Sequence, residues 1–231
     1  MDEIEVVVVR VFTDQRGTNG NELGIVTSSP ATAGREQDIA AALGFSETVF
    51  IDALDESGGI ATIRIFTPAA ELPFAGHPSV GTAWWLAHER TPVGALAEKA
   101  GDVAVSVDLD ADEAAIDARA EWAPAFTWLP LATPADVDAL DPFSFTEGQH
   151  YAYAWIDEAA GTLRARMFAP AMGIVEDEAT GAAAVAITAK LGRALRITQG
   201  EGSELVTEPL GEGLIRVGGT VVYDRTIDAT L

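Results

Sequence analysis

A stretch near residue 80 constrains the fold of this chain more than any other part of its sequence. A short turn, Phe74-Ala75-Gly76-His77, leads into Pro78, which suits the first turn of a helix because its missing N–H is not needed there. The helix that follows, to near Arg90, is apolar on nearly every side, so we expect it to be buried. The start of a buried helix carries free N–H groups and partial positive charge. Gly76 and His77 therefore predict the wall of a small-molecule site.

Composition limits the class of protein. The chain has 231 residues, of which 48% are hydrophobic, enough for one large or two small domains. No apolar run reaches transmembrane length, and Met1-Asp2-Glu3 opens no signal-type segment, so we expect a cytoplasmic protein without a membrane partner. The formal net charge of −22 disfavours nucleic acid as a partner. Solubility is its simplest explanation.

Residue types exclude several kinds of chemistry. The absence of cysteine removes disulfides, thiolate catalysis and sulfur-ligated metals. His77, His88 and His150 are scattered without carboxylates at ligand spacing, so no metal site is expected. The only lysines, Lys99 and Lys190, lie in no recognisable pyridoxal phosphate setting, and no dinucleotide- or phosphate-binding glycine pattern is present. We therefore expect no cofactor.

The first half predicts strands around one helix. Apolar and β-branched runs predict strands at residues 4–12, 23–26, 46–51 and 60–66, the last two joined by a Gly58-Gly59 turn. Residues 35–43 have helical spacing, and Gly44 is placed to end that helix. After the central helix, strands are predicted at residues 103–109 and 114–122, and a short helix at Thr133-Pro134-Ala135-Asp136. No element is assigned to residues 141–150.

The second half repeats this arrangement. Residues 151–156 and 162–168 predict a hairpin that ends in Arg166-Met167-Phe168-Ala169-Pro170, which parallels Arg64-Ile65-Phe66-Thr67-Pro68. Each segment precedes a glycine-containing turn and an apolar helix, at 76–87 and at 180–191. Gly192 is placed to end the second helix, and strands at 194–198, 203–207, 214–217 and 220–223 follow, separated by Gly-rich turns. We therefore expect strands wrapped around one apolar helix, twice.

Three titratable groups are candidates for chemistry. Glu47 lies in an otherwise small or apolar strand, although a strand glutamate more often faces water. His77 is equally consistent with a structural role. The acidic run Glu176-Asp177-Glu178 precedes Thr180-Gly181, where carboxylates also cap helices and complement their dipole. Two carboxylates from separate halves, with a histidine between them, would form an acid/base pair able to move a proton on a substrate.

Several motifs together resemble the PhzF-like family of phenazine-biosynthesis proteins. They occur in that family's order and leave only about residues 90–150 uncovered: Ser46-Glu47-Thr48-Val49-Phe50, residues 64–68 with Glu71, Gly76-His77, residues 166–168, Glu176-Asp177, Thr180-Gly181 and Ile197-Thr198-Gln199-Gly200. The resemblance implies an α+β, diaminopimelate epimerase-like fold of two similar domains, each a β-barrel-like sheet around a central helix. We place these domains at residues 1–110 and 111–231, with the boundary within about 95–150.

The resemblance also implies a reaction and a site. It implies cofactor-free isomerisation in the cleft between the halves, with Glu47, His77 and Asp177 as catalytic residues and Glu47 as the proton shuttle. Ser46, Gly76, Thr180, Gly181 and Ala182 would bind substrate, with both helix N-termini facing a carboxylate. The best-known family member isomerises a dihydro-hydroxyanthranilate on the way to phenazines, although most relatives have no such role. A homodimer is a further expectation, to which Trp122, Trp128 and Trp155 would contribute.

The chain departs from the family pattern at several positions. Pro78-Ser79 stands where the family commonly has Ala-Thr, and Glu178 replaces the usual proline and adds a charge near the site. Ala182 replaces a serine whose hydroxyl would contact substrate, which indicates a different substrate or weaker activity. The chain is also shorter than typical members.

Two functions remain open at this point. The first is an isomerase that uses general acid/base proton transfer on a small carboxylated cyclic or unsaturated metabolite. The second is a catalytically silent relative that binds a metabolite or a protein partner, which Ala182 would favour. Convergence of Glu47, His77 and Asp177 on one closed cleft would separate the two.

Overall fold

The computed structural model describes residues 3–55, 57 and 59–230. The predicted Gly58-Gly59 turn therefore lies partly outside the described residues, because Gly58 is not among them. None of the described helices is long and apolar enough to cross a membrane.

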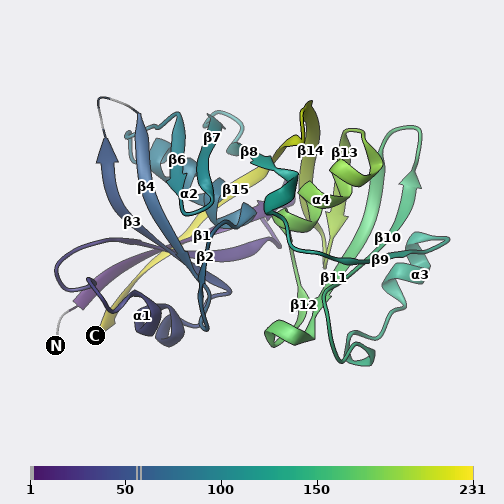
Figure 1. Ribbon diagram of the computed structural model, residues 1–231, viewed down its shortest axis with the longest axis horizontal. Helices are drawn as coiled ribbons and strands as arrows, with labels where there is room; N and C mark the ends of the chain where they lie inside the picture. Colours follow the sequence, from purple (N-terminus) through teal and green to yellow (C-terminus); the bar gives the residue numbers. More distant parts are fainter. Residues whose placement is uncertain (1–2, 56, 58, 231) are drawn as a thin grey trace.

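The first half is a closed barrel around helix α2 (Gly76–His88). Its strands follow one another around the barrel in the order β1 (Glu3–Thr13), β2 (Asn21–Thr27), β3 (Glu47–Asp55), β4 (Ile60–Phe66), β6 (Ala95–Glu98), β7 (Gly101–Asp108), β8 (Glu113–Arg119) and β15 (Leu214–Thr230). Antiparallel pairing of β15 with β1 closes the ring. Figure 1 shows α2 inside this half, and both chain ends on its outer side.

The second half is built on helix α4 (Gly181–Leu191). From β15 its strands run in the order β14 (Ser203–Gly211), β13 (Leu195–Gln199), β11 (Thr162–Ala169), β10 (His150–Asp157) and β9 (Thr127–Pro130). Two short strands, β5 (Glu71–Leu72) and β12 (Ile174–Asp177), pair with β4 and β11, respectively. The fold is therefore α+β, as predicted, with the two halves side by side (Figure 1).

Strand pairing confirms the internal repeat. In the first half β2 is parallel to β3 and β4 is parallel to β6. In the second half β9 is parallel to β10 and β11 is parallel to β13. In both halves the connection between the last two parallel strands is the buried helix, α2 or α4. Each half therefore wraps its sheet around the helix that links two of its own strands.

The two arginines of the repeated sequence hold equivalent outer helices. Arg64 in β4 forms an ion pair with Glu36 of α1 (Glu36–Leu43) at 2.8 Å. Arg166 in β11 donates to the Leu140 carbonyl at 2.7 Å, just after α3 (Pro134–Asp138). Arg166 also forms a two-point ion pair with Glu176 of β12, at 2.8 and 2.6 Å. These arginines therefore join the outer helices to the sheets instead of facing the cavity described below.

The helix ends agree with the sequence. Gly44 and Gly192 end α1 and α4 in the left-handed conformation, at φ 72° and 66°. Thr133 and Asp136 form a reciprocal capping box at the start of α3.

In α2 every residue except Trp85 and His88 is buried. Full burial of a side chain such as Leu86 stabilises the fold by about 1.5–3 kcal/mol, so hydrophobic packing holds this helix in place.

One prediction for the C-terminal strands was wrong. Residues 214–217 and 220–223 are not two strands separated by a turn, because β15 runs unbroken from Leu214 to Thr230. Gly218 lies in register with Ala115 of β8, and a Cβ there would be 2.5 Å from the Ala115 Cβ. The glycine pair therefore serves close strand packing, and β15 continues into the first half to pair with β1.

Smaller differences between the predicted and observed elements occur in the segment that connects the two halves. The strand predicted at residues 114–122 ends at Arg119, and a 3-10 turn, η1 (Ala120–Trp122), follows it. Residues 142–144 form another 3-10 turn. Trp122, Trp128 and Trp155, considered above as dimer contacts, are half-buried and pack against the main core.

Candidate active site

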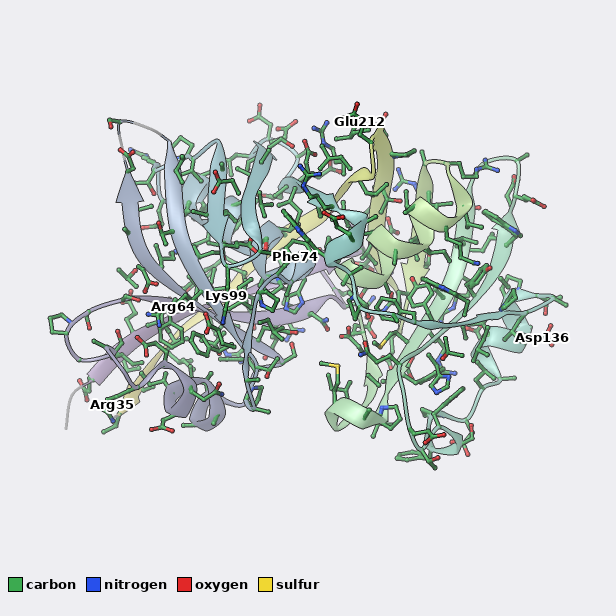
Figure 2. All side chains as sticks on the ribbon, viewed as in Figure 1. Arg35, Arg64, Phe74, Lys99, Asp136 and Glu212 are labelled. Carbon is green, nitrogen blue, oxygen red and sulfur yellow. The ribbon has the colours of Figure 1, made fainter. Side chains whose placement is uncertain are left out.

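A cavity of about 320 Å³ lies where the first turns of α2 and α4 face each other. Glu47, His77, Gln149, Asp177 and Thr180 are the polar side chains that line it. Its apolar lining comes from both halves: Leu72, Pro73, Phe74, Trp122, Pro124, Phe126, Met167, Met172 and Ile174. Figure 2 shows Phe74 near the boundary between the halves. The cavity is therefore a mostly apolar space with a few polar groups.

Glu47 and His77 face each other inside this cavity. Glu47 begins β3, and His77 is the second residue of α2. Their Oε2 and Nε2 atoms are 3.4 Å apart, with only 15% and 6% of the respective side chains exposed. Neither atom has a hydrogen-bond partner among the described residues. Buried polar atoms normally have partners, so this pair is available to a ligand.

The surroundings of Glu47 favour its protonated form. Burial is the largest effect and raises the pKa of the Glu47 carboxyl. The negative charge of Asp177 raises that pKa further, whereas His77 and a hydrogen bond from the Ser46 hydroxyl lower it. A carboxyl with a raised pKa is a stronger base once it is ionised. Such a group suits the role of a general base.

Asp177 is held by residues from both halves. Asn21, at the start of β2, donates its amide to Asp177 Oδ1 at 2.7 Å and to the Ala179 carbonyl at 2.8 Å. Thr180 donates its hydroxyl to Asp177 Oδ2 at 2.5 Å. Both carboxylate oxygens of Asp177 therefore accept hydrogen bonds from the protein. This arrangement fixes the carboxylate as an oriented negative charge.

A second layer of buried groups supports the Asp177 loop. Gln199, fully buried at the end of β13, donates to the Asp177 carbonyl and to the Thr180 hydroxyl, both at 2.9 Å. Tyr151 in turn donates to Gln199 Oε1 at 3.1 Å. Gln199 belongs to the Ile197-Thr198-Gln199-Gly200 motif. The position of Asp177 thus depends on residues from β2, β10 and β13.

The structure brings most of the predicted site residues together. Gly76, His77 and Glu47 line the cavity from the first half, and Asp177, Thr180, Gly181 and Ala182 line it from the second. Neither α2 nor α4 has a side-chain cap at its N-terminus. Ser46 is placed differently, because it is exposed and meets the Glu47 carboxyl without lining the cavity.

Glu178 lies outside the cavity and holds a neighbouring turn through hydrogen bonds. Its carboxylate accepts hydrogen bonds from the Glu201 N–H at 3.0 and 2.8 Å and from the Ser203 hydroxyl at 2.7 Å. The Ser203 hydroxyl also accepts a hydrogen bond from the Gly20 N–H at 2.9 Å. Glu178 does not line the cavity, and its charge instead holds the turn at residues 200–203 near the Gly20 loop.

The sequence analysis did not identify Asn21, Gln149 or the aromatic wall of the cavity, which consists of Phe74, Trp122 and Phe126. Phe74 packs against Trp122 with ring centroids 5.3 Å apart, and Trp122 belongs to the connection between the halves. Asn21 is the first residue of β2 and follows a segment, residues 17–20, whose glycines and asparagine offered no sign of a partner in the other half. Gln149 lies in the segment for which no element was predicted. Within residues 3–55, 57 and 59–230, no three potential metal-ligating side chains gather.

Known proteins resemble the chain over most of its length. The family model described as "Phenazine biosynthesis-like protein" matches residues 9–141 and 144–208. A trans-2,3-dihydro-3-hydroxyanthranilate isomerase of Pseudomonas fluorescens is 31% identical over 206 residues, which cover 74% of this chain and 73% of that protein. The protein of the same name from Pseudomonas aeruginosa is 28% identical over 236 residues, covering 87% and 84% of the two chains.

Solved structures share the fold. A PhzF-family phenazine biosynthesis protein of Bacillus anthracis superimposes with a TM-score of 0.78 at 21% identity, covering 100% of both chains. A probable proline racemase from Agrobacterium radiobacter gives a TM-score of 0.65 at 11% identity, covering 99% of this chain and 93% of the other. The fold is thus shared with both PhzF proteins and racemases. Because the family model spans most of both halves, the chain belongs to the phenazine biosynthesis-like (PhzC-PhzF) protein family.

Proposed function

We propose that this protein is a cofactor-independent isomerase that moves a proton on a small carboxylated cyclic or unsaturated metabolite. The observation that carries the proposal is the Glu47–His77 pair, whose facing atoms are buried, 3.4 Å apart and without hydrogen-bond partners among the described residues. The curated relatives named above are isomerases, which supports the same reaction class.

In the proposed reaction Glu47 is the proton carrier. Its ionised carboxylate takes a proton from a substrate carbon and returns it to a different carbon, so the double bond shifts and no electrons leave the substrate. The raised pKa of Glu47 makes it a stronger base than an exposed glutamate. His77 polarises and orients the substrate beside it, while the fixed charge of Asp177 orients the substrate and helps to keep the Glu47 pKa raised.

The cavity indicates the class of substrate. Phe74, Trp122 and Phe126 supply an aromatic wall, which suits an unsaturated ring. The uncapped starts of α2 and α4, at Gly76 and Gly181, offer N–H groups that suit a carboxylate. A volume of about 320 Å³ fits a small metabolite. The relatives' substrate, trans-2,3-dihydro-3-hydroxyanthranilate, has this size and chemistry and is the first compound to test.

Solvent deuterium exchange tests the proposal. The protein is incubated in D₂O with trans-2,3-dihydro-3-hydroxyanthranilate and with a panel of carboxylated cyclic compounds, and deuterium at carbon is followed by mass spectrometry and NMR. We expect incorporation with at least one compound and a loss of about 10²–10⁴-fold in Glu47→Gln.

The matched control is Glu5→Gln, which changes an exposed glutamate in strand β1 of the same half and should leave exchange unaltered. Near wild-type exchange in Glu47→Gln would remove the assigned base. Binding without exchange across the whole panel would instead support the catalytically silent alternative.

A further inference from the structure

A second buried carboxyl lies behind the cavity wall, outside the proposed catalytic pair. Glu98, the last residue of β6, places its Oε1 atom 2.5 Å from the Ser79 hydroxyl oxygen in α2. The same hydroxyl oxygen is 2.7 Å from the carbonyl oxygen of Ala75, which precedes α2 and lines the cavity. The other carboxyl oxygen, Oε2, is buried without a partner among the described residues.

The hydrogens available to these three groups determine the protonation of Glu98. A serine hydroxyl has one hydrogen, and a carbonyl oxygen can only accept. The Ser79 hydrogen therefore goes to Ala75, and the short contact with Glu98 then requires a hydrogen on the carboxyl. If Ser79 donated to an ionised Glu98 instead, its oxygen would face the Ala75 carbonyl at 2.7 Å with no hydrogen between them. The geometry thus favours a neutral carboxylic acid that donates to Ser79.

This chain of hydrogen bonds holds the part of α2 that carries His77. The start of α2 has no side-chain cap, and the Ser79 N–H reaches the Ala75 carbonyl only at 3.3 Å. The Ser79 hydroxyl supplies the shorter contact to the same carbonyl. His77 lies between Ala75 and Ser79 in the chain. The orientation of its ring toward Glu47 therefore depends on the geometry of this turn.

We propose that Glu98 is a positioning residue: as a neutral acid it clamps the first turn of α2 through Ser79 and so holds His77 against Glu47, and its ionisation releases the clamp. The catalytic consequence rests on the proposed function, whereas the clamp does not. In the ionised state the Glu98 carboxylate cannot donate a hydrogen bond. Either the Ser79 hydroxyl then donates to Glu98 and its hydrogen bond to the Ala75 carbonyl is lost, or the buried negative charge of Glu98 has no hydrogen-bond donor.

Burial, and not a neighbouring charge, is the main cause of the shifted pKa of Glu98. Lys99, the next residue, pairs with Glu71 of β5 at 3.0 Å. Asp102, opposite Ala97 in β7, is exposed, and the paired positions of β4 are Ile60, Ala61 and Thr62. In α2 the His77 Nε2 atom faces Glu47. Burial raises the pKa of Glu98 to about 8, and the Ser79 contact opposes that rise. Glu98 is therefore mostly neutral at pH 7 and ionises just above it.

The matched variant is Glu98→Gln, whose amide keeps a donor for Ser79 at every pH. Two measurements test the clamp without any substrate. The ¹³C signal of the Glu98 carboxyl, assigned by its absence in Glu98→Gln, should show a protonated acid at pH 6 and titrate near pH 8. Amide hydrogen exchange of Gly76, His77, Ser79 and Val80 should be equal in wild type and Glu98→Gln at pH 6, and faster in wild type at pH 9.

The third measurement is the pH profile of substrate exchange. With a pKa of about 8, about one tenth of Glu98 stays neutral at pH 9. We expect a fall of about tenfold in the wild-type rate between pH 7 and 9, and no such fall in Glu98→Gln. Glu71→Gln, which changes the half-buried partner of Lys99, should keep the wild-type profile.

Two results would overturn the proposal. One is a Glu98 carboxyl that is ionised at pH 6, and the other is an identical alkaline fall in wild type and Glu98→Gln. Because the NMR and hydrogen-exchange arms need no turnover, a protein that isomerises nothing would refute the proposed function while the clamp is still tested.

Discussion

Gly76 and Gly181, the first residues of the two buried helices, lie in backbone contact across the boundary between the halves. A Cβ added to Gly76 would be 2.9 Å from the Gly181 Cα, and one added to Gly181 would be 3.0 Å from the Gly76 Cα. Both residues line the cavity. Only glycine at both positions allows the two helix N-termini to approach closely enough to share one ligand.

Gly76→Ala should therefore separate the two helix N-termini. The new methyl group meets backbone atoms, which cannot move aside as a flexible side chain would. We expect the free energy of unfolding to fall by about 1–3 kcal/mol, with loss of substrate exchange. Denaturant unfolding and deuterium incorporation measure the two effects. Gly94→Ala is the control, because its Cβ would be 3.8 Å from the nearest atom, the Gly59 carbonyl oxygen. Equal behaviour of the two variants would contradict the tight contact.

Glu47→Gln should stabilise the protein while abolishing its activity. The pKa of Glu47 is raised in the folded state above its ordinary value of 4.5, so the folded protein holds this proton more tightly than the unfolded chain does. This contribution to stability is present below pH 4.5 and is lost as the pH rises through the folded-state pKa. The amide of Gln removes the buried charge and should gain about 1–3 kcal/mol at pH 8.

The measurement is urea unfolding of wild type and Glu47→Gln at pH 5 and pH 8. The stability difference between the two proteins should be larger at pH 8. Glu5→Gln, at an exposed position, should stay within about 0.5 kcal/mol of wild type at both pH values. A Glu47→Gln protein less stable than wild type at pH 8 would show that the buried charge is compensated.

Asn21→Asp should damage the site more than Asn21→Ala. The alanine variant removes both hydrogen bonds, to Asp177 and to the Ala179 carbonyl, at a cost of about 1–3 kcal/mol in stability. The aspartate variant instead places a second carboxylate about where the amide now lies, 2.7 Å from Asp177 Oδ1. Repulsion between the two carboxylates should lower the exchange rate further, increasingly so as the pH rises.

Exchange rates at pH 6 and pH 8 for both Asn21 variants check this order. Gln37→Ala removes a single side-chain hydrogen bond, to the Thr67 carbonyl, and neither residue lines the cavity. It should lower stability without changing exchange. If Asn21→Asp were as active as Asn21→Ala at pH 8, Asn21 would not set the electrostatics of Asp177.

Gln149→Leu should weaken substrate binding more than turnover. Gln149 lines the cavity, and its side-chain amide has no hydrogen-bond partner within the described part of the chain. Because protein donors already occupy both Asp177 oxygens, a polar substituent of the substrate has Gln149 as an open partner. We expect KM to rise about 3- to 10-fold with little change in kcat. Gln15→Leu, at an exposed loop position, should change neither constant. A fall in kcat at constant KM would instead assign Gln149 to the chemical step.

Local patterns in the sequence determined a large part of this protein. The apolar stretch after Pro78 and the glycines at 44 and 192 predict helices and their ends from interactions within a few residues of chain. The repeated Arg-x-Phe-x-Pro segments predicted two equivalent halves, and the strand pairing confirms them. The residues themselves made Glu47, His77 and the acidic run 176–178 candidates, and the resemblance to known motifs then selected Asp177 from that run and assigned the roles. The structure gathers Glu47, His77 and Asp177 around one cavity.

Only the tertiary structure decided which distant groups meet. Gly218-Gly219 looks like a turn in the sequence, yet it lies inside β15. Neighbouring strands leave no room for a side chain there: β8 approaches Gly218, and Glu204 and Phe12 approach Gly219. Asn21 reaches Asp177 across 156 positions of chain, and the Glu98 carboxyl meets Ser79 of α2 with its Oε2 atom buried. Hydrogen bonds and desolvation act through space over a few ångströms. A sequence pattern describes neighbours along the chain, whereas the pKa values and charges of this site are set by neighbours that folding brings together.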